Sequence, residues 1–396
     1  PDFGPADFNA RSGATAVSAR DFLVAYNVNL NTTSTRRANA IAFDVRERGR
    51  VKRDPPLTGP IVRDEHGEAV TTPGSLKCTK GIGWFIEEYG IAQISLNLTN
   101  IAVTPVHVAF DEVSEKARAR GIRVTGSELV GLIPLDAMLA AGRHYLRKQQ
   151  RSTGVSDAEL VKIAVRSMGL DDLVPFVPEE KIIEYAIRDK TQVRLVDRSL
   201  EGFVEETASE SPAPGGGSVS AAVGALGAAL GTMVANLSSH KRGWDERWEE
   251  FSDWAEKGKA AHAELLALVD RDTEAFNAIM AAWKADAAVR DEAIQAATKQ
   301  AIDVPLRIME VALGSMEVLR AMAETGLSAS ASDAGVGALC ARTAVRGAAL
   351  NVRINAKDLT DDEARTGYLR KTEELLSAAA EAEGAILAVV EGNLTN

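Results

Sequence analysis

The chain has 396 residues, of which 45% are hydrophobic and 26% are charged, and its formal net charge is −11. This composition is typical of an ordinary soluble globular protein, and its acidity argues against a role in non-specific nucleic-acid binding. At roughly 150 residues per domain, the length favours two or three domains.

Metal ligands and disulfide partners are sparse. Cys78 and Cys340 are the only cysteines and lie in different halves of the chain. This usage favours a reducing compartment, and we expect a cytoplasmic protein. The five histidines have no HxxxH spacing and the cysteines no CxxC spacing, so we expect no metal site.

The first half of the chain alternates strand-like and helix-like patterns. We predict a strand over 21–30, a helix over about 35–49, two strands within GIGWFIEEYGIAQISLNLTN, a helix from Pro105 to about Arg120 and a strand in VTGSELVGLI. Residues 50–80 are rich in proline and glycine and predict a long loop. The order strand, helix, strand, strand, helix, strand predicts a ferredoxin-like α+β sandwich, with helical extensions over 135–190.

The second half predicts an all-α helical bundle, because alternating strand patterns end near residue 198 and long helical periodicity begins. Breaks are expected at SPAPGGGS and at 324–327. Helices are expected near 200–208, 218–240, 245–284, 290–323, 332–356 and 361–392.

An uncharged stretch between Ser211 and Ser239 is long enough to cross a membrane. Its Ala, Gly and Ser content, its isolation and its polar residues favour a helix buried on every side instead, so we expect no membrane partner. Gly215, Gly216 and Gly217 precede this helix, and Ser218 is a candidate N-cap. Such a loop exposes amide donors suited to a carboxylate or a phosphate, although flexible turns share the pattern.

Several separated motifs resemble a known family. The runs PAPGGGSVSAAVGALGAALGTMVANL, LVDRDTEAFNAIM and SASDAGVGALCARTAVRGAALNVRINAKDL resemble the cyclodeaminase family. PDFGPADF, GATAVSARDFLVAYNVNLNT, KGIGWFIEEYGIAQISLNLTN and GSELVGLIPLDAML resemble the C-terminal subdomain of glutamate formimidoyltransferase. In this order the two halves are similar to the bifunctional formimidoyltransferase–cyclodeaminases.

The resemblance implies three parts: residues 1–15 as the tail of a missing N-terminal transferase subdomain, 16–198 as the C-terminal transferase subdomain, and 199–396 as the cyclodeaminase domain. The family's catalytic histidine lies in the subdomain that is missing. The chain also starts without Met and without a secretory signal. We therefore expect a sequence trimmed from something longer, with formimidoyltransferase activity only where the other subdomain is present.

For the second half, the resemblance implies conversion of 5-formimidoyltetrahydrofolate to 5,10-methenyltetrahydrofolate and ammonia, as part of histidine degradation. Tetrahydrofolate is then the substrate and one-carbon carrier. Asp272 matches the family's proton donor. Helical spacing places it between Leu268 and Phe276 on an apolar stripe, which favours a raised pKa, whereas Asp270 points elsewhere. The alternative for Asp272 is a solvated or capping residue.

Further residues are candidate substrate ligands. Asn351 and Asn355 share a helix face, and Asp333 either caps a helix or binds ligand. Asn27 and Asn29 alternate along the first strand, where they line either a folate cleft or the outside of an edge strand. The predicted substrate-binding set is Gly215, Gly216, Gly217, Ser218, Asp333, Asn351, Asn355, Asn27 and Asn29.

The expected partners are folate derivatives, polyglutamylated ones included, and further copies of this chain. A homodimer or larger homo-oligomer is expected because helices this poor in aromatic residues bury enough surface only by packing on partners, and because the family's site lies between subunits. Two alternatives stay open: a methenyltetrahydrofolate cyclohydrolase, and a non-catalytic scaffold that assembles oligomers.

Overall fold

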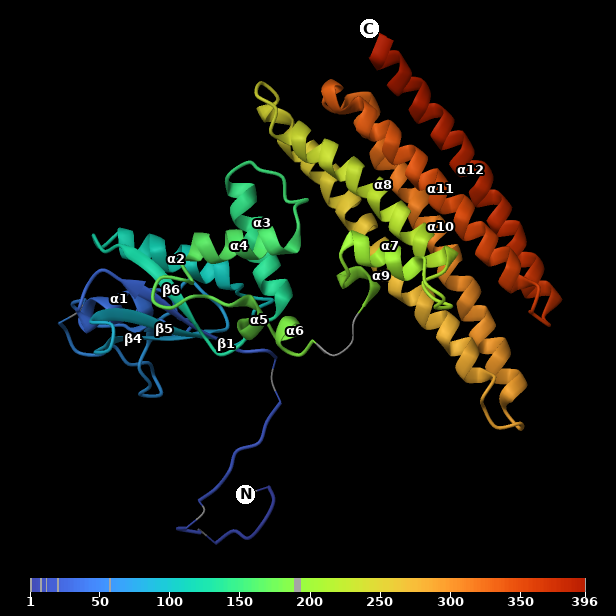
Figure 1. Cartoon of the computed structure of the whole chain (residues 1–396). Coiled ribbons are helices and arrows are strands. Elements are labelled where there is room, and N and C mark those ends of the chain that lie inside the picture. Colours follow the sequence, from blue (N-terminus) through green and yellow to red (C-terminus); the bar gives the residue numbers. More distant parts are fainter. Residues whose placement is uncertain are drawn as a thin grey trace. The chain divides into compact units, whose positions relative to one another are not determined.

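A computed structural model describes residues 2–7, 9–11, 13–19, 21–56, 58–188 and 194–395. They belong to two compact units, Pro1–His144 with Val161–Arg188, and Tyr145–Leu160 with Asp189–Asn396 (Figure 1). Residues 145–160, which the sequence assigned to the first half, thus pack with the helical unit. One reason is the Thr153 hydroxyl, which lies 3.0 Å from Ser252 Oγ.

The first unit is built on a four-stranded antiparallel sheet with the order β4-β5-β1-β6. Its helices α1 and α2 pack against the sheet and against each other. Val24, Tyr26, Val28 and Leu30 of β1 are buried, so alternate residues of this strand form the core. The elements are β1 (Val24–Leu30), α1 (Thr35–Val45), β4 (Thr79–Ile86), β5 (Ile91–Leu98), α2 (Val106–Arg118) and β6 (Val124–Val130).

The segment predicted as a long loop contains a small hairpin. Strands β2 (Arg50–Val51) and β3 (Thr71–Thr72) pair antiparallel, and bridges join Arg53 to Ile61 and Arg63 to Ala69. These pairings are too short for sequence alternation to reveal. The predicted helical extensions are confirmed as α3 (Leu135–Lys148), α4 (Asp157–Met168), α5 (Pro178–Lys181) and α6 (Ile183–Ala186).

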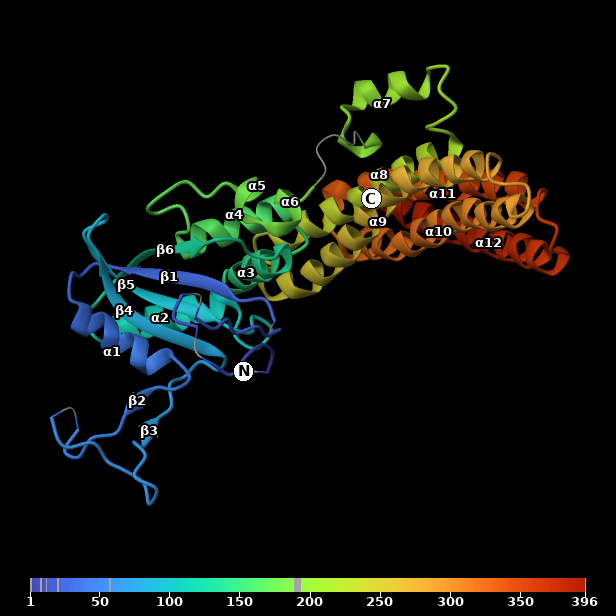
Figure 2. The same ribbon diagram turned by 90° about the horizontal axis from the view of Figure 1, so that it is seen from below.

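The second unit is helical, as predicted. Its five longest helices run side by side along much of their length (Figures 1 and 2). The elements are η1 (Leu195–Asp197), α7 (Leu200–Thr207), α8 (Gly216–Ser239), η2 (Asp245–Arg247), α9 (Trp248–Ala282), α10 (Arg290–Thr325), η3 (Ser328–Ser330), α11 (Ala331–Ala356) and α12 (Asp362–Thr395).

Helix α8 packs within this bundle and contacts α9, α10 and α11. Among the described residues it is the one helix long and apolar enough to cross a membrane, with a mean hydropathy of 1.6, but 61% of its apolar window is buried inside the protein. Burial by neighbouring helices accounts for its apolar surface, as expected for a core helix.

Small residues let α8 and α11 approach closely. A Cβ atom built on Gly227 would lie 2.7 Å from the carbonyl oxygen of Gly337, and one on Gly224 would lie 3.0 Å from Ala344 Cβ. Near the start of α8, a Cβ on Gly216 would lie 3.3 Å from Asn351 Nδ2. The two helices therefore run antiparallel, so that the N-terminus of α8 meets the C-terminal part of α11.

The close approach at Gly227 predicts that alanine substitutions at Gly227 and at Gly384 have opposite effects on stability. Gly227→Ala should lower the free energy of unfolding by about 1–3 kcal/mol, because the new methyl group overlaps backbone of α11. Gly384→Ala in α12, where the methyl group meets nothing within 4 Å, should raise it by about 0.5–1 kcal/mol through helix propensity. Urea unfolding of both variants measures the two effects, and equal shifts would contradict the packing argument.

Candidate functional site

Asp272 of α9 lies against the first turn of α8. Its Oδ2 atom accepts a hydrogen bond from the Ser218 backbone N–H at 2.7 Å and lies 3.0 Å from Ser218 Oγ. Ser218 Oγ is also 2.9 Å from the Val269 carbonyl oxygen, one turn back on α9. A carboxyl group is thus fixed at the positive end of a helix.

Burial raises the pKa of Asp272 above its ordinary value of 3.8, and the two hydrogen bonds from Ser218 oppose part of that rise. Desolvation dominates because the charged form loses more hydration than two donors replace. The raised pKa agrees with the expectation from the apolar stripe of α9. A carboxylic acid that keeps its proton to higher pH is suited to donate that proton.

The glycines before Ser218 make room for this carboxyl group. A Cβ on Gly217 would lie 2.0 Å from Asp272 Oδ1, whereas one on Gly215 would meet nothing within 4 Å. Gly215, with extended backbone, is the N-cap of α8. The prediction that Ser218 caps the helix is therefore wrong: Ser218 lies inside the first turn, and its hydroxyl faces α9.

A cavity of about 220 Å³ opens beside Asp272. Asn351 Nδ2 donates to the Gly347 carbonyl at 3.0 Å, and Asn355 Nδ2 donates to the Ala301 carbonyl at 2.7 Å. These bonds orient both amides on the wall of the cavity. The lining residues are Pro212, Ala213, Gly215, Gly216, Asp272, Thr273, Ala275, Phe276, Ile279, Ala301, Asn351 and Asn355.

The structure brings most of the predicted second-half residues together, with one exception. Asp333 lies in the first turn of α11, 18 residues before Asn351, which is about 27 Å along the helix axis. The N-cap of α11 is Ser330 rather than Asp333. Asp270 is also separate from the cavity, since its Oδ1 accepts the Leu195 N–H at 2.6 Å.

Asn27 and Asn29 lie in the first unit and are buried. Their strand β1 is flanked by β5 and β6, so the alternative of an edge strand is wrong. Asn29 Nδ2 donates to Asp172 Oδ2 at 3.0 Å and Asn29 Oδ1 accepts from Gln93 Nε2 at 2.8 Å. Asn27 Nδ2 donates to Glu128 Oε2 at 3.2 Å. The alternating pattern in the sequence identified the two asparagines as candidate residues. It could not identify their hydrogen-bond partners, which lie on other segments of the chain.

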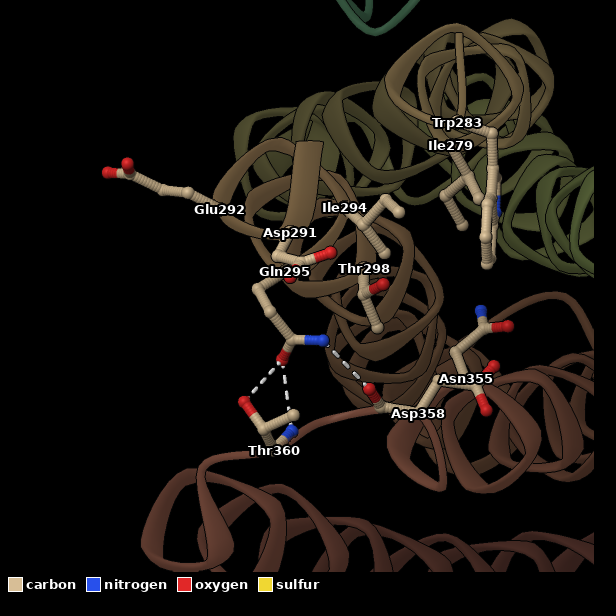
Figure 3. A pocket seen from close by; sticks show the side chains of 10 residues that line it. All are labelled: Ile279, Trp283, Asp291, Glu292, Ile294, Gln295, Thr298, Asn355, Asp358 and Thr360. Carbon is tan, nitrogen blue, oxygen red and sulfur yellow. Dashed lines mark hydrogen bonds between the residues drawn. The ribbon is translucent and has the colours of Figure 1, made fainter. Parts of the chain in front are cut away.

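A larger cavity, of about 630 Å³, shares Ile279 and Asn355 with the one beside Asp272 (Figure 3). No motif in the sequence indicates this cavity, because it forms where the end of α9, the start of α10 and the segment after α11 meet. Trp283, the C-cap of α9, lies on its wall. Within the described ranges, no three His, Cys, Asp or Glu side chains gather as a metal ion would require.

The raised pKa of Asp272 predicts a pH-dependent effect on stability. Because the folded pKa exceeds the unfolded value, the carboxyl group destabilises the native state progressively as pH rises above the unfolded value. Asp272→Asn removes this penalty and keeps an acceptor for Ser218. The free energy of unfolding of the variant relative to the native protein should therefore rise from about pH 4 to about pH 7. A constant difference in urea unfolding across that range would contradict the buried acid.

Comparison with known proteins gives two family matches. Residues 25–188 match the family described as Formiminotransferase domain, and residues 199–374 match Formiminotransferase-cyclodeaminase. The formimidoyltransferase-cyclodeaminase of Mus musculus is 38% identical over 401 residues, which cover 100% of this chain and 70% of the mouse protein.

Two further comparisons each cover about half of this chain. A methenyltetrahydrofolate cyclohydrolase of Methylorubrum extorquens is 37% identical over 189 residues, covering 46% of this chain and 91% of that protein. The crystal structure of a formiminotetrahydrofolate cyclodeaminase from Thermotoga maritima is 31% identical, covers 50% of this chain and 97% of that chain, and has a TM-score of 0.47.

Proposed function

The chain belongs to the formimidoyltransferase-cyclodeaminase family, and we propose that its helical unit converts 5-formimidoyltetrahydrofolate into 5,10-methenyltetrahydrofolate and ammonia. Tetrahydrofolate is then both the substrate and the carrier of the one-carbon group. The observation that carries this proposal is the Asp272 carboxyl group, whose pKa is raised by burial at the wall of a cavity.

The reaction needs an acid at the departing nitrogen. A second folate nitrogen attacks the formimidoyl carbon, a new carbon–nitrogen bond forms, and the bond to the amino nitrogen must break. Amide ions leave poorly, so protonation of that nitrogen lets it depart as ammonia. A positioned acid contributes about 10²–10⁴ in rate to such a step. Asp272, held by Ser218, is the acid in this proposal.

The other groups of the cavity support binding rather than proton transfer. Gly215 and Gly216 leave the start of α8 without side chains, so a ligand can approach the backbone there. The amides of Asn351 and Asn355 supply donors and acceptors but no proton at neutral pH. We assign Gly215, Gly216, Gly217, Ser218, Asn351 and Asn355 to substrate binding and positioning around Asp272.

A second candidate is methenyltetrahydrofolate cyclohydrolase activity, which the name of the Methylorubrum relative favours. Both reactions pass through a tetrahedral carbon between two folate nitrogens, and both need proton transfer. They differ in the group that leaves or enters, ammonia in one reaction and water in the other. Measurement of released ammonia therefore separates them.

For the first unit we propose a ferredoxin-like sandwich whose polar sheet residues Asn27 and Asn29 contribute to a folate-binding wall. The sheet order β4-β5-β1-β6, with α1 and α2 packed against it, supports the fold assignment. The prediction that the transferase is incomplete receives no support from the matches, which span this whole chain, and it stays a prediction.

We also propose a cytoplasmic homodimer or larger homo-oligomer. Apolar side chains exposed along α11 support self-association: Val336, Leu339, Leu350 and Ile354 are each at least 46% exposed. Such side chains on one helix are suited to an interface between copies. Asp333 lies in the same helix, and its assignment to substrate binding stays a prediction.

The assignment of the acid predicts the kinetics of one substitution. Asp272→Asn should lower kcat for ammonia release from 5-formimidoyltetrahydrofolate by about 10²–10⁴, because Asn cannot supply the proton. Asp270→Asn is a matched control on the same helix, since Asp270 faces Leu195 rather than the cavity. It should retain kcat within about twofold, as expected for a residue outside the site.

Unchanged turnover in Asp272→Asn would refute the acid. If the protein hydrolyses 5,10-methenyltetrahydrofolate but releases no ammonia from the formimidoyl substrate, the activity is that of a cyclohydrolase and not of a deaminase. A chain that binds no folate derivative in a titration would instead support the non-catalytic scaffold.

A further inference from the structure

The larger cavity adjoins the acid's cavity and has no role in the proton transfer. Because both cavities share Ile279 and Asn355, a ligand anchored beside Asp272 can extend from one into the other. The smaller cavity, at about 220 Å³, is below the roughly 300–1,000 Å³ typical of ligand sites. A folate derivative must therefore continue beyond it, and the adjoining space of about 630 Å³ is large enough to receive one end.

The walls of the larger cavity differ in character. Trp283 is 60% exposed and lies near Ile279 on the α9 side (Figure 3). An exposed tryptophan beside an aliphatic side chain offers a flat apolar surface to a ring. On the other walls are the carboxylates of Asp291, in the first turn of α10, and Asp358, just after α11. No hydrogen bond or ion pair within the described ranges occupies either side-chain carboxylate.

A hydroxyl group is also directed into this cavity. The Thr298 residue is only 3% exposed and lines the space, and its hydroxyl points inward (Figure 3). Other helical threonines, such as Thr343, donate to the carbonyl one turn back, but within the described residues Thr298 Oγ1 makes no such bond. The Oγ1 atom is accessible in the cavity rather than fully buried. This hydroxyl is therefore available to hydrogen-bond a ligand there.

The charges decide which end of a folate fits. The glutamate end carries carboxylates, which Asp291 and Asp358 would repel. The pterin end is a flat ring whose amino group and ring N–H form a donor edge, and carboxylates accept bonds from such an edge. Ile279 is seven residues after Asp272, or about 10 Å along the helix. The ring that contains the reacting nitrogen can thus reach the rim shared by the two cavities.

We propose that the larger cavity is the pterin subsite of this enzyme, with the ring against Ile279 and Trp283, its donor edge facing Asp291 and Asp358, and Thr298 hydrogen-bonded to a polar atom of the ring. This inference rests on the proposed function, because it assumes that the reacting carbon lies beside Asp272. It assigns the p-aminobenzoylglutamate end to the other side of the acid.

The test uses two probes and the full chain. The first probe, 6-methyltetrahydropterin, has the ring without the tail, and p-aminobenzoylglutamate has the tail without the ring. Asp291→Asn and Asp358→Asn should each weaken binding of the pterin probe about tenfold, as expected for loss of a charge-assisted hydrogen bond. Thr298→Val should weaken it too. None of the three should weaken binding of the tail probe in titration calorimetry.

Glu363→Gln is the control for Asp291→Asn. Glu363 lies in the first turn of α12 and Asp291 in the first turn of α10, so both substitutions remove a favourable charge at a helix N-terminus. Glu363 is not among the residues that line the larger cavity, so this variant should bind the pterin probe like the native protein. Equal losses in both variants would show a general effect on helix stability and would overturn the subsite.

Kinetics separate the subsite from the proposed function. In Asp291→Asn and Asp358→Asn, KM for the formimidoyl substrate should rise about tenfold with kcat nearly unchanged, as expected for lost uniform binding. If both variants release ammonia with unchanged KM and unchanged pterin binding, the subsite is overturned but the proposed deaminase activity stands. Pterin binding that depends on Asp291 without any ammonia release would overturn the deaminase and support the subsite. Failure of the native protein to bind the pterin probe would overturn the subsite.

Discussion

The helical unit depends on the near absence of side-chain volume along α8. Three long helices contact it, and at Gly227 the backbone of α11 lies where a side chain would begin. Packing this close yields many weak dispersion contacts, which together offset the entropy of ordering long helices. It also brings the first turn of α8 against the Asp272 carboxyl group of α9.

The environment of Asp272 follows from the same constraint. At Gly217 a single methyl group would overlap Asp272 Oδ1, so the carboxyl group occupies space that a side chain on α8 would otherwise fill. Contact with a helix N-terminus alone would lower the pKa of an acid, but burial raises the pKa of Asp272 despite the two hydrogen bonds from Ser218. The close packing of backbone and carboxyl group therefore sets both the position and the protonation of the acid.

Much of this architecture could be predicted from the sequence because its signals are local. Long apolar periodicity defined the helices of the second unit to within a few residues, and alternation defined β1, β4 and β5. The N-cap of α8 could not be assigned in this way, because the Ser218 hydroxyl is directed to Val269 and Asp272 on α9. Nor could the partners of Asn29, since Gln93 and Asp172 lie 64 and 143 residues away in sequence.

The larger cavity could not be predicted from the sequence, although the residues of α9 that line it follow a regular spacing. Asp272, Phe276, Ile279 and Trp283 follow one another on α9 at spacings of four, three and four residues, so they share one face. Periodicity alone marks this stripe as core. It becomes a site only because α10 and α11 leave space opposite it, where Thr298 and Asn355 face inward. The acid and the aromatic surface are then held at a fixed spacing by the helix itself, so the register of α9 determines where along a bound ligand the proton is delivered.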